Sequence, residues 1–453
     1  MAFFNRSVVI HFRNLGNIMQ KAINFVVNRV DMNDPLWGRK FLSSIVNYIN
    51  FIALIVLIPL LLFPYTPATI ICFYVFFVSY LIEIVTDKKW KNFRFDKIKL
   101  YYLVMAVFFL LAIIYLPFEK TNTHVSTLLE RRLPLIGFAV VGFLGVNHLY
   151  KLNRFLYTFI LASVAAIVYM FYRIGITEME FGSHPFALFT EKLALYVGSH
   201  MKVNFYLNIS IIGIWYILKN DWKIISRWKK ISLIAALAMM LTVLVTNEGR
   251  AGFIAGMLLC FVFIFIEIYT RWKKASVVCI LVFPILFAGA VNLQQRLTMD
   301  SINSDPRTFL WKSAWEVIKE RPLLGHGIND AQAVFDEKMK LYQTAEYQEY
   351  SIYMEQTKNE KYQDSHNQYL QAMMEFGVLG LILLLFMFVF PIFAVDKNRM
   401  LFTVFIVFLY MFLSIFDMYV TRLYAPIFGI LTLMMLVAES NKKTKAEKYA
   451  IVL

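Results

Sequence analysis

The side chains of this sequence that could do chemistry are one histidine and a group of arginines. His366 lies in the run SHNQYL at residues 365–370, directly before an apolar segment. An imidazole with a reference pKa of about 6.5 can accept a proton at neutral pH, so His366 could serve as a general base. The alternative is a histidine at a membrane interface whose polar atoms are satisfied by its neighbours.

The arginines of interest stand at the ends of apolar segments or open the helix expected in the long loop. They are Arg131, Arg132, Arg173, Arg250 and Arg307. A guanidinium at the end of a membrane span is costly unless an anion lies beside it. Because a guanidinium binds phosphate in a bidentate fork and keeps its charge near neutral pH, the group could bind the diphosphate of a lipid. For any single arginine, snorkelling or a salt bridge with a neighbouring glutamate is the alternative.

Composition places most of the chain in a membrane. Of 453 residues, 59% are hydrophobic and only 17% are charged, whereas a soluble domain is roughly 45–50% apolar and 25% charged. About twelve apolar runs could cross a hydrocarbon core of about 30 Å as helices. They lie near residues 45–63, 67–86, 100–117, 133–150, 155–172, 203–218, 231–247, 251–269, 275–291, 377–395, 400–416 and 426–438. The sequence therefore predicts an all-α, polytopic integral membrane protein with about twelve transmembrane helices.

The basic residues predict the orientation of these helices. If the N-terminus is cytoplasmic, the even-numbered connections and both ends hold most of the 45 Lys and Arg residues, as the positive-inside rule requires. This bias accounts for the net charge of +15, so no nucleic-acid partner is expected. The predicted organisation is a cytoplasmic amphipathic lead-in at 1–44, membrane helices one to nine at 45–291, a large outer loop with the candidate catalytic motif at 292–376, helices ten to twelve at 377–438, and a basic cytoplasmic tail at 439–453.

The long loop is itself expected to be helical. Asp305 offers an N-cap, Pro306 suits the first helical position, and Pro322 would end that helix. Residues 323–327 (LLGHG) predict a turn, after which Asn329 could cap a second helix. Since long loops in compact architectures are usually functional, this loop is the expected location of the site.

Four short motifs occupy the second half of the chain. They are the Gly-Arg-x-Gly turn at 249–252, PLLGHG at 322–327, HNQYL at 366–370 and EFGVLG at 375–380. In this combination the chain resembles the O-antigen ligase and polymerase superfamily over about residues 240–395. The resemblance implies a multi-pass protein of the bacterial inner membrane. It further implies that the protein transfers a glycan from undecaprenyl diphosphate to an acceptor hydroxyl at the periplasmic face, with inversion and without a metal, in surface polysaccharide or lipopolysaccharide biosynthesis.

The resemblance also implies roles for individual residues and partners. Arg250, in the Gly-Arg-x-Gly turn, and a second outer arginine would bind the diphosphate, and His366 would be the catalytic base. We place the second arginine at Arg173, in preference to Arg131, Arg132 or Arg307. The partners would be the lipid-linked glycan donor, the lipid A core or another glycan acceptor, and membrane lipid.

Other acceptors and a transport function are the alternatives to this activity. The acceptor could be the lipid A core for a ligase, another lipid-linked repeat for a polymerase, or a protein for an oligosaccharyltransferase, and we expect a ligase because one long loop precedes the last three spans. A transporter or flippase should show charged residues in mid-span and repeated halves, neither of which is evident.

No metal or cofactor is expected from the sequence. The histidines lack the spacing of metal ligands, and the cysteines Cys72, Cys260 and Cys279 fall inside apolar runs. The sequence also contains no phosphate loop and no dinucleotide fingerprint.

The predicted orientation can be tested by labelling single cysteines placed in the loops. Residues 292–376 should react with a membrane-impermeant reagent added from outside, and residues 219–230 and the tail should react only when the cytoplasmic side is exposed. Labelling of the long loop from the cytoplasm would contradict the proposed site, because the lipid-linked donor would then lie on the other side.

Overall fold

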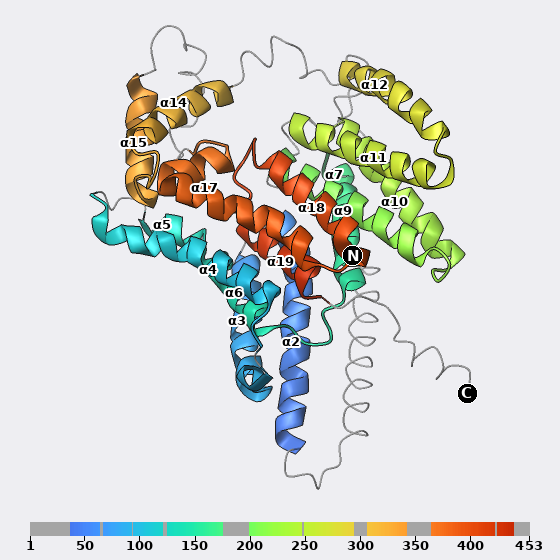
Figure 1. Cartoon of the computed structure of the whole chain (residues 1–453). Helices are drawn as coiled ribbons and strands as arrows, with labels where there is room; N and C mark the ends of the chain where they lie inside the picture. Colours follow the sequence, from blue (N-terminus) through green and yellow to red (C-terminus); the bar gives the residue numbers. More distant parts are fainter. Residues whose placement is uncertain are drawn as a thin grey trace, which may run out of the picture.

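The computed structural model describes residues 37–63, 67–92, 94–120, 125–174, 199–246, 249–293, 306–341, 364–421 and 424–438. Within these ranges every secondary-structure element is a helix (Figure 1). The predicted tail at 439–453 and most of the predicted lead-in lie outside the described residues.

The helices follow the apolar runs of the sequence. The first group comprises α2 (Trp37–Leu62), α3 (Pro67–Thr86), η1 (Lys89–Asn92), α4 (Lys97–Tyr115), η2 (Leu116–Phe118), α5 (Val125–Glu130), α6 (Leu133–Leu144), α7 (Leu152–Ile174) and α9 (His200–Asp221). The second group comprises α10 (Arg227–Thr246), α11 (Arg250–Arg271), α12 (Ala275–Leu293), α14 (Pro306–Glu320), α15 (Ile328–Leu341), α17 (Gln368–Ala394), α18 (Lys397–Leu413) and α19 (Ala425–Leu436).

Eight helices in the described ranges are long and apolar enough to cross a membrane. They belong to α2, α3, α4 with η2, α7, α9, α10, α11 and α17. The other four predicted runs also contain helices, namely α6, α12, α18 and α19. The protein is therefore an all-helical, multi-pass membrane protein, while the count of twelve spans and the outer position of the long loop remain predictions.

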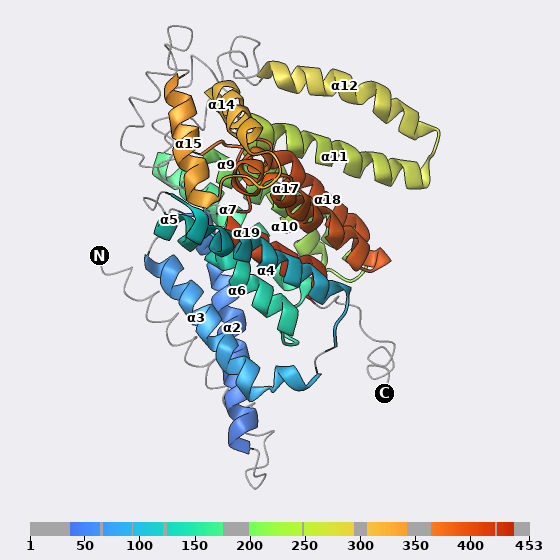
Figure 2. The same ribbon diagram turned by 60° about the vertical axis from the view of Figure 1, so that its left-hand side comes forward.

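Helix α9 lies at the centre of the bundle. Every residue from 202 to 214 is buried, and the helix packs against α7, α10, α11 and α18. A helix that is buried on all sides must have its polar side chains bonded within the bundle, as those of Asn204 and Asn208 are. Figure 2 shows α11 and α12 side by side on one flank and α2 and α3 on the other, so α9 connects the two flanks through its neighbours.

The Gly-Arg-x-Gly turn fits against α9 through two asparagines. Asn204 Nδ2 donates to the Gly249 carbonyl at 3.0 Å, and Asn208 Nδ2 donates to the Gly252 carbonyl at 2.9 Å. A Cβ at Gly249 or Gly252 would lie 2.1 or 2.4 Å from side-chain atoms of Asn204. Both glycines are needed for this close approach, which fixes where Arg250 begins α11.

The loop helices are joined to α17 by backbone hydrogen bonds between residues 322–327 and residues 374–378. We call this contact the loop–helix junction. Its bonds run from His326 N to Met374 O (2.9 Å), from Gly327 N to Glu375 O (2.8 Å) and from Val378 N to Pro322 O (3.0 Å). Two of the four sequence motifs, PLLGHG and EFGVLG, are thus the two sides of one contact.

Two glycines make the loop–helix junction possible. Gly325 has φ +72°, and a Cβ there would lie 2.5 Å from the carbonyl carbon of Glu375. Gly377 has φ +61°, and its Cβ would lie 2.3 Å from the carbonyl carbon of Leu323. L-residues rarely adopt such backbone angles, and glycine has no Cβ to clash. Gly377 also interrupts the helical geometry of α17, so this helix changes direction where the loop contacts it.

Helices α14 and α15 form a small apolar core of their own above the start of α17 (Figure 1). The core contains Phe309, Leu310, Ala314, Val317, Ile318, Ala331, Phe335 and Met339, together with Met374 of α17. The predicted start of the first loop helix at Pro306 and its end before Pro322 are confirmed. Asn329 lies inside α15 rather than at its cap, because the helix begins at Ile328. Asp305 lies outside the described residues.

Replacing Gly377 by alanine should weaken the loop–helix junction. Backbone strain of this kind costs about 1–3 kcal/mol, and the new Cβ would also overlap the Leu323 carbonyl, so the purified variant should unfold at a lower temperature and its loop should be cleaved faster by protease. Gly289→Ala is the matched control, since a Cβ at Gly289 meets no atom within 4 Å. Equal protease resistance of the Gly377→Ala and wild-type proteins would contradict the role given to the junction.

Candidate functional site

His366 lies in a tight turn directly before α17. Its φ of +47° is in the left-handed region, which residues other than glycine seldom occupy. The backbone N–H of His366 donates to Asp364 Oδ1 at 3.0 Å, and Asn367 caps α17 by accepting from the N–H groups of Tyr369 and Leu370. Since such strained backbone persists only where the surroundings determine it, this turn fixes the position of the imidazole.

Two buried carboxylates face the same nitrogen of His366. The Nδ1 atom lies 3.6 Å from Asp364 Oδ1 and 3.5 Å from Asp417 Oδ1. These separations exceed those of a normal hydrogen bond, but they allow the carboxylates to stabilise a positive imidazolium. Because both acids lie on the Nδ1 side and the His366 side chain is 20% exposed, the Nε2 atom is the one suited to exchange a proton with a substrate.

Asp417 reaches His366 because Gln368 holds the segment on which it lies. The Gln368 Oε1 atom accepts from the N–H groups of Val420 (2.9 Å) and Thr421 (3.2 Å). The Gln368 backbone N–H donates to the Ser414 carbonyl at 2.9 Å. One turn of α17 therefore positions residues 414–421, which are about 50 residues away along the chain.

The same three side chains also satisfy the geometry of a metal site. The ligand atoms of Asp364, His366 and Asp417 all lie within 4.8 Å of one another. Oxygen and imidazole ligands of this kind suit several divalent cations. The cluster can thus be interpreted as a histidine oriented by two acids or as a set of metal ligands, and chelation distinguishes the two, as described below.

Arg307, at the start of α14, lies close to the His366 cluster. Its Nη2 atom is 3.7 Å from the sulfur of Met201 in the first turn of α9. One turn further along α14, the ring of Trp311 lies 6.3 Å from that of Phe416, the residue before Asp417. Burial raises the pKa of Tyr419 well above its ordinary value, Asp417 adds to this rise, and the charge of Arg307 opposes it. These contacts place Arg307 beside the segment that carries Asp417.

Arg250 approaches the same end of α9. It is the first residue of α11 and is half-buried, and the preceding Gly249 is bonded to Asn204 in the first turn of α9. Lys202, in that same turn, is 5% exposed and its Nζ lies 3.3 Å from the Phe63 carbonyl. Three cationic side chains, Arg250, Arg307 and Lys202, are therefore carried by elements that meet at the beginning of α9.

Helix N-termini add to the positive charge of this region. Helices α9, α11, α14 and α17 begin at His200, Arg250, Pro306 and Gln368, and the contacts described above join these four starting points. Each helix start carries a partial positive charge, which favours anions. A diphosphate would therefore be stabilised here by dipoles as well as by side chains.

Arg132 has a different setting from the other predicted arginines. It is 1% exposed, and its Nη2 lies 2.5 Å from Oε1 of the fully buried Glu375. Gln371 donates to the same Glu375 oxygen at 2.8 Å and accepts from the Ser365 hydroxyl at 3.1 Å. Through Gln371, the buried pair is therefore hydrogen-bonded to Ser365, the residue next to His366. We interpret Arg132 as a positioning residue rather than a diphosphate ligand.

The two remaining predicted arginines are Arg131 and Arg173. Arg131 is half-buried beside Arg132, in the turn between α5 and α6. Arg173 lies in the last turn of α7, and its side chain is outside the described residues. The contacts thus link Arg307 to the start of α9, to which the start of α11 with Arg250 is also bonded, and they link the same loop helix to the segment of Asp417 beside His366.

Sequence reasoning missed three residues of this region. Asp417 and Lys202 belong to no motif that the sequence analysis recognised, and Asn204 stands in an apolar run. The available signals were the four-residue spacing of Asn204 and Asn208, which puts both on one face of a helix, and the charged residues Asp417 and Lys202 at ends of apolar runs. Only the folded chain shows that these residues meet the motifs.

Removing one partner of the Arg132–Glu375 pair should be more harmful than removing both charges. An uncompensated buried charge costs about 3–5 kcal/mol, whereas neutral replacement of a whole pair is often tolerated. We therefore expect Arg132→Met to lower the thermal unfolding temperature strongly and the double variant Arg132→Met/Glu375→Gln to recover much of the stability and transfer activity. A stable but inactive double variant would instead indicate that Arg132 binds substrate.

Comparison with known proteins agrees with the motif analysis. No curated protein matches the chain. Residues 235–385 match the model of a family described as O-antigen ligase, and this stretch contains Arg250, Arg307, His366 and both sides of the loop–helix junction. Members of this family are membrane glycosyltransferases, so the match supports an enzyme that acts on a lipid-linked glycan donor and a glycan acceptor. Over this region, about a third of the chain, the protein is similar to the O-antigen ligase family.

Proposed function

We propose that this protein transfers a glycan from undecaprenyl diphosphate to an acceptor hydroxyl, as an O-antigen ligase does, at the periplasmic face of the bacterial inner membrane. The reaction inverts the anomeric carbon and needs no metal, and the expected acceptor is the lipid A core. The observation that carries the proposal is His366 with its two carboxylates. Arg307 contacts the start of α9, and the start of α11 that carries Arg250 is bonded to the same helix, inside the region that matches the family.

In the proposed reaction His366 is the general base. Its Nε2 atom takes the proton of the acceptor hydroxyl while the oxygen attacks the anomeric carbon of the donor. The bond between that carbon and the diphosphate oxygen breaks, and the bonding electrons leave with undecaprenyl diphosphate. Asp364 and Asp417 stabilise the imidazolium that forms, as an acid does beside the histidine of a catalytic triad. A single displacement of this kind inverts the configuration.

The arginines take the role that a metal has in other diphosphate chemistry. Arg250 and Arg307 would bind the diphosphate, with Arg173 as a further candidate from the sequence, and their charge would stabilise the leaving group as its bond breaks. Lys202 and the helix starts add positive charge to the same region. Because these groups are fixed by the fold before the substrate binds, little reorganisation is needed during the reaction.

The family match leaves the acceptor open. A polymerase acting on a second lipid-linked repeat and a protein oligosaccharyltransferase use the same chemistry, and they remain alternatives. The transporter or flippase alternative is weaker, because the acids near span ends are used in structural pairs. Glu83 lies 2.6 Å from Lys89, and Glu267 lies 2.7 Å from Lys219.

The role of His366 is tested with purified enzyme in liposomes that contain the lipid-linked donor and lipid A core. Loss of a general base typically lowers the rate by about 10²–10⁴-fold, so His366→Gln should reduce the single-turnover rate by that factor while the protein remains folded. His148→Gln, an exposed histidine elsewhere in the chain, is the control. A near-normal rate for His366→Gln would show that this side chain at most positions the substrate.

Chelation separates the two interpretations of the cluster. If His366 is a base, treatment with EDTA followed by removal of free metal should leave the wild-type rate unchanged. Loss of activity that Mg²⁺ or Mn²⁺ restores would instead make Asp364, His366 and Asp417 metal ligands.

Arg250→Lys tests the diphosphate contact. Lysine keeps the charge but cannot form the bidentate fork, so we expect at least a tenfold loss in kcat/KM for the donor with normal membrane insertion. Arg271→Lys, at the opposite end of the same helix, is the matched control. Full activity of Arg250→Lys would mean that charge alone, or another arginine, binds the donor.

A further inference from the structure

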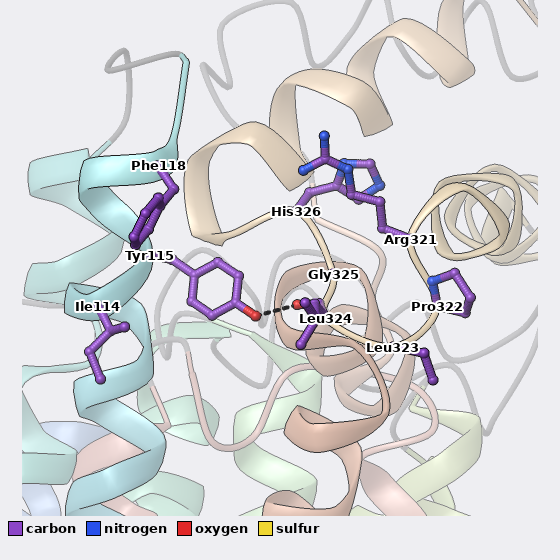
Figure 3. A pocket seen from close by; sticks show the side chains of 9 residues that line it. All are labelled: Ile114, Tyr115, Phe118, Arg321, Pro322, Leu323, Leu324, Gly325 and His326. Carbon is purple, nitrogen blue, oxygen red and sulfur yellow. Dashed lines mark hydrogen bonds between the residues drawn. The ribbon is translucent and has the colours of Figure 1, made fainter.

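A groove of about 600 Å³ lies at the outer end of α4, apart from the His366 cluster. One wall is formed by Ile114, Tyr115 and Phe118, and the other by Arg321 and by residues 322–326 of the loop–helix junction (Figure 3). The hydroxyl of Tyr115 donates to the Leu324 carbonyl at 2.6 Å, which ties the two walls together. Because this hydrogen bond joins the two walls, the fold fixes their positions relative to each other.

The apolar side chains of the groove are exposed to an unusual degree. Phe118 is 80% exposed, Leu323 70% and Leu324 65%. Phe118 ends the apolar span that contains α4, so these side chains lie at the level where the span leaves the membrane. Ile114, one turn earlier, continues the groove onto the exposed apolar face of α4. The lower end of the groove is thus continuous with the surface that faces lipid tails.

The other end of the groove is cationic. Figure 3 shows Arg321 and His326 at the end furthest from Ile114. Burial lowers the pKa of His326, so Arg321 carries the positive charge there. The neighbouring acid Glu320 is engaged by Lys338 at 2.5 Å. An apolar groove with a guanidinium at one end suits a lipid that carries phosphate. The acyl chains can lie against the apolar side chains, and the phosphate can pair with the guanidinium.

This groove is too far from the proposed diphosphate site to hold the same headgroup. Arg307 is the second residue of α14 and Arg321 directly follows its last residue, Glu320. At a rise of 1.5 Å per helical residue, the two are separated by about 20 Å. A transferase that joins two membrane-anchored glycans must hold two lipids, and their heads cannot share one position. The acceptor's glycan would then extend along α14 toward His366, while its lipid remains at the membrane.

We propose that the groove between α4 and residues 321–326 binds the phosphate-bearing lipid anchor of the acceptor. Leu323, Leu324 and Phe118 contact its acyl chains, and Arg321 pairs with a phosphate of its head. This inference rests on the proposed function, since it identifies how the acceptor of that reaction is held.

The test compares two acceptors, intact lipid A core and the same core after removal of its acyl chains, with enzyme in nanodiscs. For the wild-type enzyme the KM of the intact acceptor should be at least tenfold lower. Leu324→Ser should remove most of this difference, whereas Arg321→Gln should raise the KM of both acceptors, because both keep the phosphate. Neither variant should change the KM of the donor. Leu161→Ser, an equally exposed position on α7, should behave as wild type. An unchanged preference in Leu324→Ser together with an unchanged acceptor KM in Arg321→Gln would overturn the proposal, and so would a rise in donor KM.

A direct binding measurement keeps this inference separate from the proposed function. If the wild-type enzyme transfers to neither acceptor, the proposed function fails, but binding of intact lipid A core to the nanodisc-embedded protein can still be measured. Binding that is at least tenfold weaker in Leu324→Ser, with an unchanged unfolding temperature, supports the groove as a glycolipid site. Equal binding by the wild-type and variant proteins overturns it.

Discussion

The backbone contact between residues 322–327 and residues 374–378 is the constraint on which the rest of the structure depends. Two glycines with positive φ, Gly325 and Gly377, allow the two segments to approach more closely than any Cβ would permit. The contact holds α14 and α15 over the start of α17, and it bends α17 at Gly377. This contact positions the turn at His366, the first turn of α14 with Arg307 and the groove at α4.

Polar side chains inside an otherwise apolar bundle then refine these positions. Asn204 brings the start of α11 to α9, and Gln368 brings Asp417 to His366. The buried ion pair between Arg132 and Glu375 joins the first part of α17 to the turn before α6. Unpaired polar groups are expensive inside a membrane protein, so each such contact favours one arrangement strongly. A small number of polar contacts can thereby hold the turn at His366 in one conformation.

Much of the fold could be predicted from the sequence, because membrane helices leave a strong apolar signal. Prolines also mark the first loop helix, which begins at Pro306 and ends two residues before Pro322. The motifs also predicted His366 and Arg250 as site residues, and their roles stay predictions. The sequence could not show that Arg132 is buried against Glu375, or that Asp417 lies beside His366, since both contacts join residues far apart along the chain. Polarity at a span end predicts a costly charge, but it does not tell which partner neutralises that charge.

The central claim is that a lipid diphosphate binds among Arg250, Arg307 and the helix starts around α9, with His366 next to the sugar that it carries. An experimental structure of the enzyme with a non-transferable undecaprenyl diphosphate sugar tests this most directly. The account predicts that the diphosphate contacts the guanidinium groups of Arg250 and Arg307 and that His366 Nε2 faces the anomeric carbon. A diphosphate bound at the other end of the bundle, or one that contacts neither arginine, would contradict it.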